Sequence, residues 1–279
     1  MFWNMYRIEQ TKLFKRKVLW VEMILMVLMV ATTAVSVFFV TQMAEVPVEI
    51  AGELSKALIW PDALTFMLGL MAGNQIGGLL MIVLVGAVVA QEYTWNSMSL
   101  WLSHSTPRSA VMISKAVVIG LASLMIVLAT FVVNALVTLI FTLFLTGGLD
   151  LSQVNFVEVF LSVLGAAFTM LPYSMLTFLL AVLSRSAYVA IGGGVAFALI
   201  FESIGGQLLR LFGGLGARIA DFLPGSLARS LTPGVITVSS ASTAPAVLDP
   251  ALAAVVIAVY SAIFFGLALW IFRRQDLTT

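Results

Sequence analysis

The residues best suited to a specific task lie in one polar stretch, residues 91–108, between two long apolar runs. The stretch reads QEYTWNSMSLWLSHSTPR, and Lys115 follows it within the next apolar run. Its acid–aromatic pair, short amphipathic middle and Pro-Arg end are groups that bind another molecule rather than groups that break bonds. A chain rarely keeps so polar and aromatic a stretch between apolar runs unless another molecule recognises it.

Catalytic groups are scarce in the rest of the chain. His104 is the single histidine, there is no cysteine, and the sequence lacks the G-x-x-x-x-G-K-[ST] loop that holds ATP phosphates. A solvated or helix-capping role accounts for His104 better than catalysis does. We therefore expect no enzyme activity, metal or cofactor in this chain.

Glu92 is the ionisable residue of the stretch with the clearest candidate role. It stands at the end of an apolar run, where its carboxylate can cap a helix N-terminus or pair with a basic residue of a partner protein. A carboxylate that is simply solvated is an equal alternative.

Composition determines the solvent in which the chain folds. Hydrophobic residues make up 61% of the 279 residues and charged residues 10%, and the mean hydropathy is +1.11. A soluble domain carries about 25% charged residues, so this chain has too little polar surface to cover itself in water. We expect an all-α polytopic membrane protein, one domain over residues 1–279, and a net charge of +1 argues against a nucleic-acid partner.

Six apolar stretches are candidates for membrane-crossing helices, which need about 20 mostly apolar residues. The third is longer than one bilayer requires and is expected to tilt or to project from the lipid, whereas the fifth is short. The predicted spans cover approximately residues 18–41, 63–90, 111–145, 157–183, 188–201 and 251–272.

The placement of Lys and Arg predicts the orientation, because cytoplasmic loops are enriched in these residues. With an even number of spans both termini share one side of the membrane. Ten of the fourteen basic residues then fall on that side: Arg7, Lys12, Lys15, Arg16, Lys17, Arg108, Lys115, Arg185, Arg273 and Arg274. We expect a multi-pass protein of the cell membrane with both termini and the 91–108 stretch in the cytoplasm.

Residues 2–17 form a distinct amphipathic segment. Lys12, Lys15 and Arg16 lie away from an apolar stripe about 120° wide on a helical wheel, and the stripe contains Phe2, Trp3, Tyr6, Leu13 and Phe14. This pattern predicts an interfacial helix with its apolar face at the acyl boundary and its basic face towards anionic headgroups. The alternative is a basic flank that only orients the first span.

Residues 202–250 are too apolar for a solvated loop, and their apolar runs are too short to span. The segment is rich in Gly and Pro and carries charges between runs such as Leu208-Leu209-Arg210-Leu211-Phe212. A re-entrant or surface-lying pair of helices fits, since irregular backbone at membrane depth must be buried in protein or line a cavity. Its second half, rich in Ser, Thr, Ala and Pro, is expected to be an exposed connector.

The polar and bend-forming residues within the predicted spans do not identify a substrate. Asn74 and Gln75 precede a Gly-Gly pair in the predicted second span, and Pro172 interrupts the fourth. These residues either line a path for a cargo or serve helix packing, because small and amide side chains also hold helices together. Pro172 is expected to bend its helix. An intramembrane series of acids suited to proton transfer is missing from the sequence, which argues against an ion-coupled carrier.

The order of these features resembles the permeases of ABC-2 type transporters. The amphipathic segment 2–17 corresponds to their elbow helix, and residues 91–110 correspond to the cytoplasmic coupling loop after the second span. The segment before the sixth span corresponds to their re-entrant element, and the Arg273-Arg274-Gln275-Asp276 tag is similar as well. Asn96-Ser97 departs from the Gly-Thr that members often show after the aromatic pair, which leaves the register of the coupling helix open.

The resemblance implies a permease of an ATP-driven exporter. A separate cytoplasmic ABC ATPase would bind and hydrolyse ATP with Mg²⁺, and a second copy or a homologous permease would complete the complex in the lipid bilayer. A charge-poor interior suits a hydrophobic or amphiphilic cargo. The alternative is an anchor or sensor subunit of an ABC-type complex that moves no cargo itself.

The coupling loop presents two apolar edges on a helical wheel. Trp95, Met98 and Leu102 form one edge, and Tyr93 and Leu100 form the other. One edge is expected to rest on the chain's own bundle and the other in a groove of the ATPase. The alternative is that both rings are interfacial anchors. The predicted coupling residues are Glu92, Tyr93, Trp95, Met98, Leu102 and Arg108.

Overall fold

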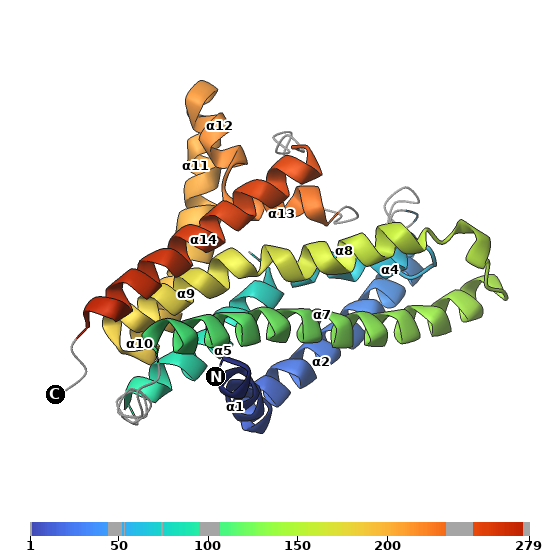
Figure 1. Ribbon diagram of the computed structural model, residues 1–279. Helices are drawn as coiled ribbons and strands as arrows, with labels where there is room; N and C mark the ends of the chain where they lie inside the picture. Colours follow the sequence, from blue (N-terminus) through green and yellow to red (C-terminus); the bar gives the residue numbers. More distant parts are fainter. Residues whose placement is uncertain are drawn as a thin grey trace.

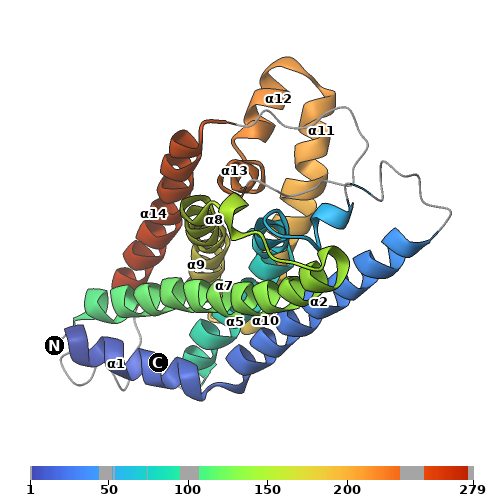
Figure 2. The same ribbon diagram turned by 90° about the vertical axis from the view of Figure 1, so that its right-hand side faces the viewer.

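The computed structural model describes residues 2–43, 52, 54–73, 75–94, 107–232 and 248–275 of the chain. These parts contain helices and no strand, and six of the helices are long and apolar enough to cross a membrane. The predicted all-α fold with six spans is therefore confirmed. The first helix and the end of the last one lie at the same end of the bundle (Figures 1 and 2), which we call the terminal end.

The spans follow one another along the chain with short elements between them. The candidate spans are α2 (Lys17–Gln42), α5 (Ile76–Thr94), α7 (Arg108–Thr146), α8 with α9 (Phe156–Thr169 and Leu171–Ser184), α10 with η3 and α11 (Ala187–Ala196, Phe197–Gly205 and Gly206–Leu211) and α14 (Pro250–Arg274). The shorter elements are α1 (Phe2–Lys15), α4 (Ala63–Phe66), η1 (Met67–Met71), η2 (Leu151–Gln153), α12 (Gly214–Asp221) and α13 (Pro224–Leu231).

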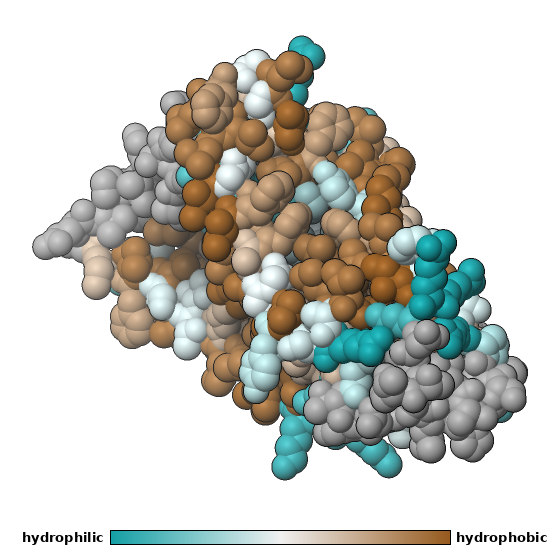
Figure 3. Space-filling model, turned by 90° about the vertical axis from the view of Figure 1, so that its left-hand side faces the viewer, coloured by the Kyte–Doolittle hydropathy of each residue, from teal (hydrophilic) through white to brown (hydrophobic). Residues whose placement is uncertain are grey.

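The surface of the bundle is apolar where lipid would contact it. Large hydrophobic side chains cover most of the face shown in Figure 3, and the hydrophilic residues gather towards one side of it. On α14 the exposed side chains recur every three or four residues as one stripe: Leu252, Val255, Val259, Ile263, Leu267 and Trp270. A soluble monomer does not expose apolar area on this scale, so the surface is that of a protein embedded in hydrocarbon.

Helix α9 lies inside the bundle and packs against α5, α10 and α14. Its Tyr173 and Phe178 are fully buried. Small residues on neighbouring helices allow this close approach; a Cβ on Gly194, for example, would collide with the side chains of Ile82 and Thr177. Glycine at such a position lets helices pack without a hydrophobic driving force from lipid.

The second span is shorter than the sequence predicted. Residues 63–71 form α4 and the 3₁₀ helix η1, and the spanning helix begins only at Ile76. Gln75 therefore lies just before the span rather than inside it, and Asn74 falls outside the described residues. Three polar side chains of α7, spaced four residues apart, bond the irregular segment: Asn134, Thr138 and Thr142. Asn134 donates to the backbone oxygen of Ala63, and the two threonine hydroxyls accept from the backbone N–H and the indole N–H of Trp60. Hydropathy missed the break because these partners lie in another helix.

The fourth span is interrupted as expected from Pro172. Helix α8 ends at Thr169 and α9 begins at Leu171, with Met170 between them. Proline lacks a backbone N–H and crowds the preceding turn, so it is tolerated in the first turn of a new helix. Pro172 is buried at that position.

The fifth span is longer than predicted. It covers Ala187–Leu211 rather than ending near residue 201, and its middle, Phe197–Gly205, is a π-helix. Glu202 and Arg210 made the sequence look unsuited to a span, but both side chains are satisfied within the protein. Residues 202–211 of the predicted 202–250 segment therefore belong to this span, and α12 and α13 follow them.

The pair α12–α13 occupies the place of the predicted re-entrant element. Helix α13 packs against α8 and α14, and α12 packs against α11. Together α11 and α12 extend away from the other helices (Figures 1 and 2). Residues 233–247, the predicted connector, lie outside the described residues, and entry of this segment into the membrane stays a prediction.

Candidate functional site

The two ends of the predicted coupling loop meet at the terminal end of the bundle. Helix α5 ends at Thr94 and α7 begins at Arg108, and we call these two helix ends the loop base. Residues 95–106 lie outside the described residues. The predicted coupling residues among them are Trp95, Met98 and Leu102, and His104 is there too. The described coupling residues are Glu92, Tyr93 and Arg108.

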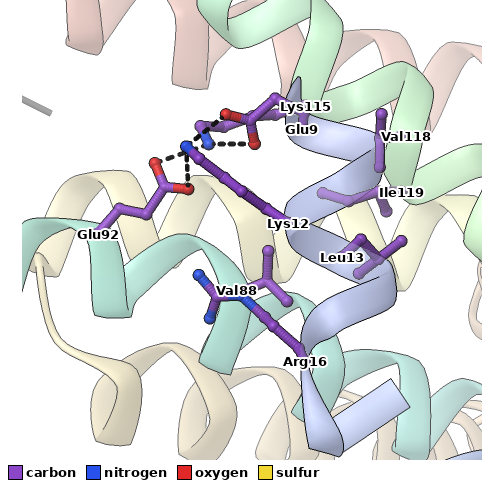
Figure 4. A pocket seen from close by; sticks show the side chains of 9 residues that line it. All are labelled: Glu9, Lys12, Leu13, Arg16, Val88, Glu92, Lys115, Val118 and Ile119. Atoms are coloured by element: carbon purple, nitrogen blue, oxygen red, sulfur yellow. Dashed lines mark hydrogen bonds and ion pairs between the residues drawn. The ribbon is translucent and has the colours of Figure 1, made fainter. Parts of the chain in front are cut away.

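Four charged side chains from three helices meet at the loop base and form what we call the charged cluster (Figure 4). Its members are Glu9 and Lys12 of α1, Glu92 of α5 and Lys115 of α7. The two carboxylates and two ammonium groups alternate, so that each acid contacts both lysines. Helix α1 is thereby bonded to both sides of the coupling loop.

The strongest contacts of the charged cluster involve Lys115. Its Nζ lies 2.6 Å from Oε2 of Glu9 and 2.7 Å from Oε2 of Glu92. The Nζ of Lys12 lies 2.9 Å from Oε1 of Glu9 and 3.4 Å from Oε1 of Glu92. The shorter distances are those of charge-assisted hydrogen bonds, which are roughly twice as strong as neutral ones.

Three of the four side chains of the charged cluster are almost completely buried. The side chains of Lys115, Glu92 and Glu9 are only 2%, 3% and 4% exposed, whereas Lys12 is 30% exposed. Burial alone would raise the pKa of Glu9, but the nearby ammonium groups of Lys115 and Lys12 outweigh it and hold that pKa below its ordinary value. Glu9 is therefore a carboxylate at neutral pH, and no acid of the cluster can lose its partner without leaving a buried charge.

The spacing of charges on α1 explains why one helix can reach both loop ends. Positions 9 and 12 lie on one face of α1, and this face carries Glu9 and Lys12 towards the bundle, while Arg16 follows directly in the extended link between α1 and α2. The guanidinium of Arg16 donates to Oε1 of Gln91 at 2.6 Å and to the backbone oxygen of Ala87 at 3.3 Å. Burial lowers the pKa of Arg16, and Glu92 and Glu9 partly counter that effect.

The prediction that Lys12 and Arg16 face lipid headgroups was wrong. Both lie away from the aromatic stripe, as the wheel indicated, but they bond to acidic and amide groups of the protein. The polar outer face of α1 is formed instead by exposed residues spaced three or four apart: Asn4, Arg7, Thr11 and Lys15. Hydrophobic periodicity alone does not distinguish a basic side chain that faces a lipid headgroup from one that pairs with a carboxylate of the protein. The interfacial position of α1 stays a prediction.

Arg108 fastens the other side of the loop to the last span. Its Nη1 donates to the backbone oxygens of Arg273 and Gln275 at 2.9 Å each, and to that of Phe272 at 3.4 Å. These carbonyls lie at the C-terminal end of α14, where the helix offers no further turn of N–H donors, although the oxygen of Phe272 also accepts from the N–H of Gln275 at 3.4 Å. A cation there also complements the helix dipole. The side-chain amide of Gln275 continues the link by donating to Val182 of α9 at 2.8 Å.

Two further predicted residues prove to belong to the chain's own packing. The ring of Tyr93 packs against the main hydrophobic core, and among the described residues its buried hydroxyl has no hydrogen-bond partner. Glu92 is not a solvated carboxylate, because it pairs with Lys12 and Lys115 of this same chain. Gln75 lies just before α5 and Pro172 lies in the first turn of α9, and neither joins the loop base.

Sequence reasoning missed the roles of Glu9 and Lys115 in the charged cluster. Lys115 was noted only as a basic residue near the loop. The available signal was the pair of charged residues at positions 9 and 12, which is unusual on a helix face that must pack against an apolar bundle. Residues 9 and 115 are far apart in the chain, and only the tertiary fold brings them together.

The described contacts of the loop base are links between helices. The described residues contain no group of three or more His, Cys, Asp or Glu that could hold a metal ion. The ion pairs and the Arg108 contacts instead join the loop ends to α1 and α14.

Comparison with known proteins supports the same interpretation. A family model described as ABC-2 family transporter protein matches residues 3–277, nearly the whole chain. A search of curated proteins found no match. The match spans all six candidate spans and the loop base, so it covers the features that carried the resemblance. This multi-pass membrane protein belongs to the ABC-2 family of transporter proteins.

Proposed function

We propose that this permease works in an ATP-driven exporter whose separate cytoplasmic ATPase docks on residues 91–110. The observation that carries the proposal is the attachment of α1 to both ends of that loop through Glu9, Glu92 and Lys115. A solvated loop needs no buried ion pairs at its base. A loop that receives force needs a stiff connection to the helices it must move.

The mechanism follows from that connection. Closure of an ATPase pair would shift the loop, and the charged cluster would carry α1 with it, because separating the pairs leaves charges buried without partners. Arg108 would carry the end of α14 in the same direction. The first and last spans would therefore respond together, which is the rearrangement that alternating access requires.

The remaining parts of the machine are proposed from composition and family. One chain contributes six spans, so a second copy or a homologous permease is needed to enclose a wide path. The apolar spans suit a hydrophobic or amphiphilic cargo. The chain itself needs no cofactor, and ATP with Mg²⁺ would bind in the partner subunit. The excess of basic residues at the terminal end supports a cytoplasmic position for both termini in the cell membrane.

The test is ATP hydrolysis in vesicles that contain this chain and a candidate ABC ATPase that binds it. Stimulation by a candidate amphiphile, together with its accumulation on the far side, is the result expected for an exporter. An anchor or sensor subunit would bind the ATPase and change its rate without any movement of cargo, and that result would overturn export.

A further inference from the structure

Glu202 is a carboxylate deep in the fifth span, far from the charged cluster. It lies fifteen residues after Ala187, about 22 Å along the helix, and it is 6% exposed. An acidic group at such a depth is rare and is expected to have a specific partner. The cytoplasmic loop base makes no contact with it that could supply one.

The two oxygens of Glu202 accept hydrogen bonds from two different elements. The hydroxyl of Tyr173 on α9 donates to Oε2, and the backbone N–H of Gly225 on α13 donates to Oε1 at 3.1 Å. Tyr173 is fully buried. One side chain of the fifth span therefore connects a core helix to the short helix α13.

Helix α13 depends on this contact because it has no cap of its own. Its N-cap residue is Leu223, which has no side-chain oxygen, and Pro224 follows without a backbone N–H. The N–H of Gly225 is thus one of the unpaired donors that a helix start leaves open. Glu202 supplies the missing acceptor from another helix.

A second link holds the same pair of short helices. Arg210, two turns further along the fifth span, lies 2.8 Å from Oδ1 of Asp221 on α12 and donates to Oγ of Ser226 on α13 at 3.1 Å. This pair is partly exposed, with side chains 17% and 18% accessible, so solvent weakens it. The buried contact at Glu202 is the stronger of the two.

The surroundings of Tyr173 fix the inner side of the contact. Gly73, just before α5, has no room for a Cβ because the Tyr173 ring and the Thr169 backbone fill that space. Its N–H donates to Oγ1 of Thr169 at 3.2 Å. The ring of Tyr173 is therefore fixed by Gly73 and Thr169, whereas its hydroxyl bonds Glu202, which in turn holds α13. The π-helix Phe197–Gly205 carries Glu202, and such segments are frequent where helices perform a function.

We propose that Glu202 is a latch that fixes α13 to the fifth span and to α9, and that breaking it frees α13 while the rest of the bundle stays packed. The latch is the contact of Glu202 with Tyr173 and Gly225. Its use as a step in transport rests on the proposed function, but the holding of α13 does not.

The test measures the exposure of α13 directly. The native chain has no cysteine, so a Ser230→Cys variant carries one thiol, on α13, at a site 6% exposed. A matched reporter, Ser123→Cys, lies on α7 at a site 1% exposed, and none of the latch contacts involves α7. Each reporter is labelled with maleimide in lipid nanodiscs without ATP or cargo, so the result does not depend on transport.

Glu202→Gln keeps the shape of the side chain but replaces one acceptor oxygen with an NH₂ group, so it can no longer accept from both Tyr173 and Gly225. It should speed labelling of Ser230→Cys about tenfold or more, since one buried donor is left without its acceptor. Tyr173→Phe leaves the Gly225 bond in place and should have a smaller effect of the same sign. The matched controls are Glu158→Gln and Tyr188→Phe, whose side chains are exposed; neither should change the rate.

The expected pattern is faster labelling at residue 230 with an unchanged rate at residue 123. An unchanged rate at residue 230 in Glu202→Gln would overturn the latch. Equal acceleration at both reporters would also overturn it, because the acid would then support the whole fold rather than α13. Neither outcome bears on the ATPase partner, which is tested separately.

Discussion

Removing the ammonium group of Lys115 should release α1 from the loop base. Lys115 is 2% exposed and contacts both acids of the charged cluster. A Lys115→Met variant keeps an apolar stem of similar length but leaves Glu9 and Glu92 facing each other with Lys12 alone. Loss of one partner from a buried ion pair costs about 3–5 kcal/mol. The lower figure applies here because Lys12 still contacts both acids, and it corresponds to a roughly hundredfold rise in the opening of α1.

The opening of α1 can be followed with one thiol. A Leu13→Cys variant places it beside the charged cluster (Figure 4), at a site 4% exposed, and the same reporter is kept in every comparison so that its own effect cancels. Labelling of purified protein in nanodiscs should be about a hundredfold faster in Lys115→Met. The control Lys15→Met removes an exposed lysine from α1, the helix that carries the Leu13→Cys reporter, and should leave the labelling rate unchanged.

A double variant separates charge balance from loss of packing. Adding Glu9→Gln to Lys115→Met leaves one acid, Glu92, with one base, Lys12. Contacting residues of this kind couple by about 0.5–3 kcal/mol, so labelling of the double variant should be several-fold slower than that of Lys115→Met. A native labelling rate in Lys115→Met, or a double variant labelled faster than the single one, would refute the role of the charged cluster.

Five further outcomes are expected. A Ser105→Cys variant should resist an impermeant thiol reagent applied to intact cells, and labelling from outside would refute the topology. Trp95→Ala should weaken ATPase binding about thirtyfold, or ~2 kcal/mol, in a pull-down titration. Tyr93→Ala should instead lower the stability of the chain itself, because the Tyr93 ring packs on its hydrophobic core. The lysines lower the pKa of Glu9 from 4.5, so its stabilising effect is complete above pH 4.5 and is lost as the pH falls through the lowered value. Hydrogen exchange of residues 5–15, corrected for intrinsic rates, should show this loss of stability in the native chain. The Glu9→Gln variant should not show it. Light scattering in mild detergent should give a dimer mass, and an active monomer would contradict pairing.

The spans that the sequence predicted best are those with uninterrupted apolar runs. The first and last were predicted within three residues at each end, over Lys17–Gln42 and Pro250–Arg274. In these helices the apolar run itself marks both ends, although α14 also packs against α9 and α2 against α7. The break in the fourth span was also predictable, since Pro172 removes a backbone donor wherever it occurs.

The misjudged segments are those where a polar group finds its partner far away in the chain. Glu202 interrupted the apolar pattern of the fifth span, yet Tyr173 and Gly225 satisfy it. The second span started late because side chains of α7 pair with the irregular backbone before it. Lys12 looked like a lipid-facing base until Glu92 was placed beside it. Pairing of this kind is tertiary information that local periodicity does not contain.

The central claim is that a separate ATPase drives this permease through the loop base. The most direct measurement is coupled transport in vesicles that contain the ATPase with either the native chain or Lys115→Met. The native complex should move cargo in proportion to ATP hydrolysed, whereas Lys115→Met should still bind the ATPase but hydrolyse ATP with little or no transport. Full coupling in Lys115→Met, or a native chain that binds no ATPase, would contradict the account.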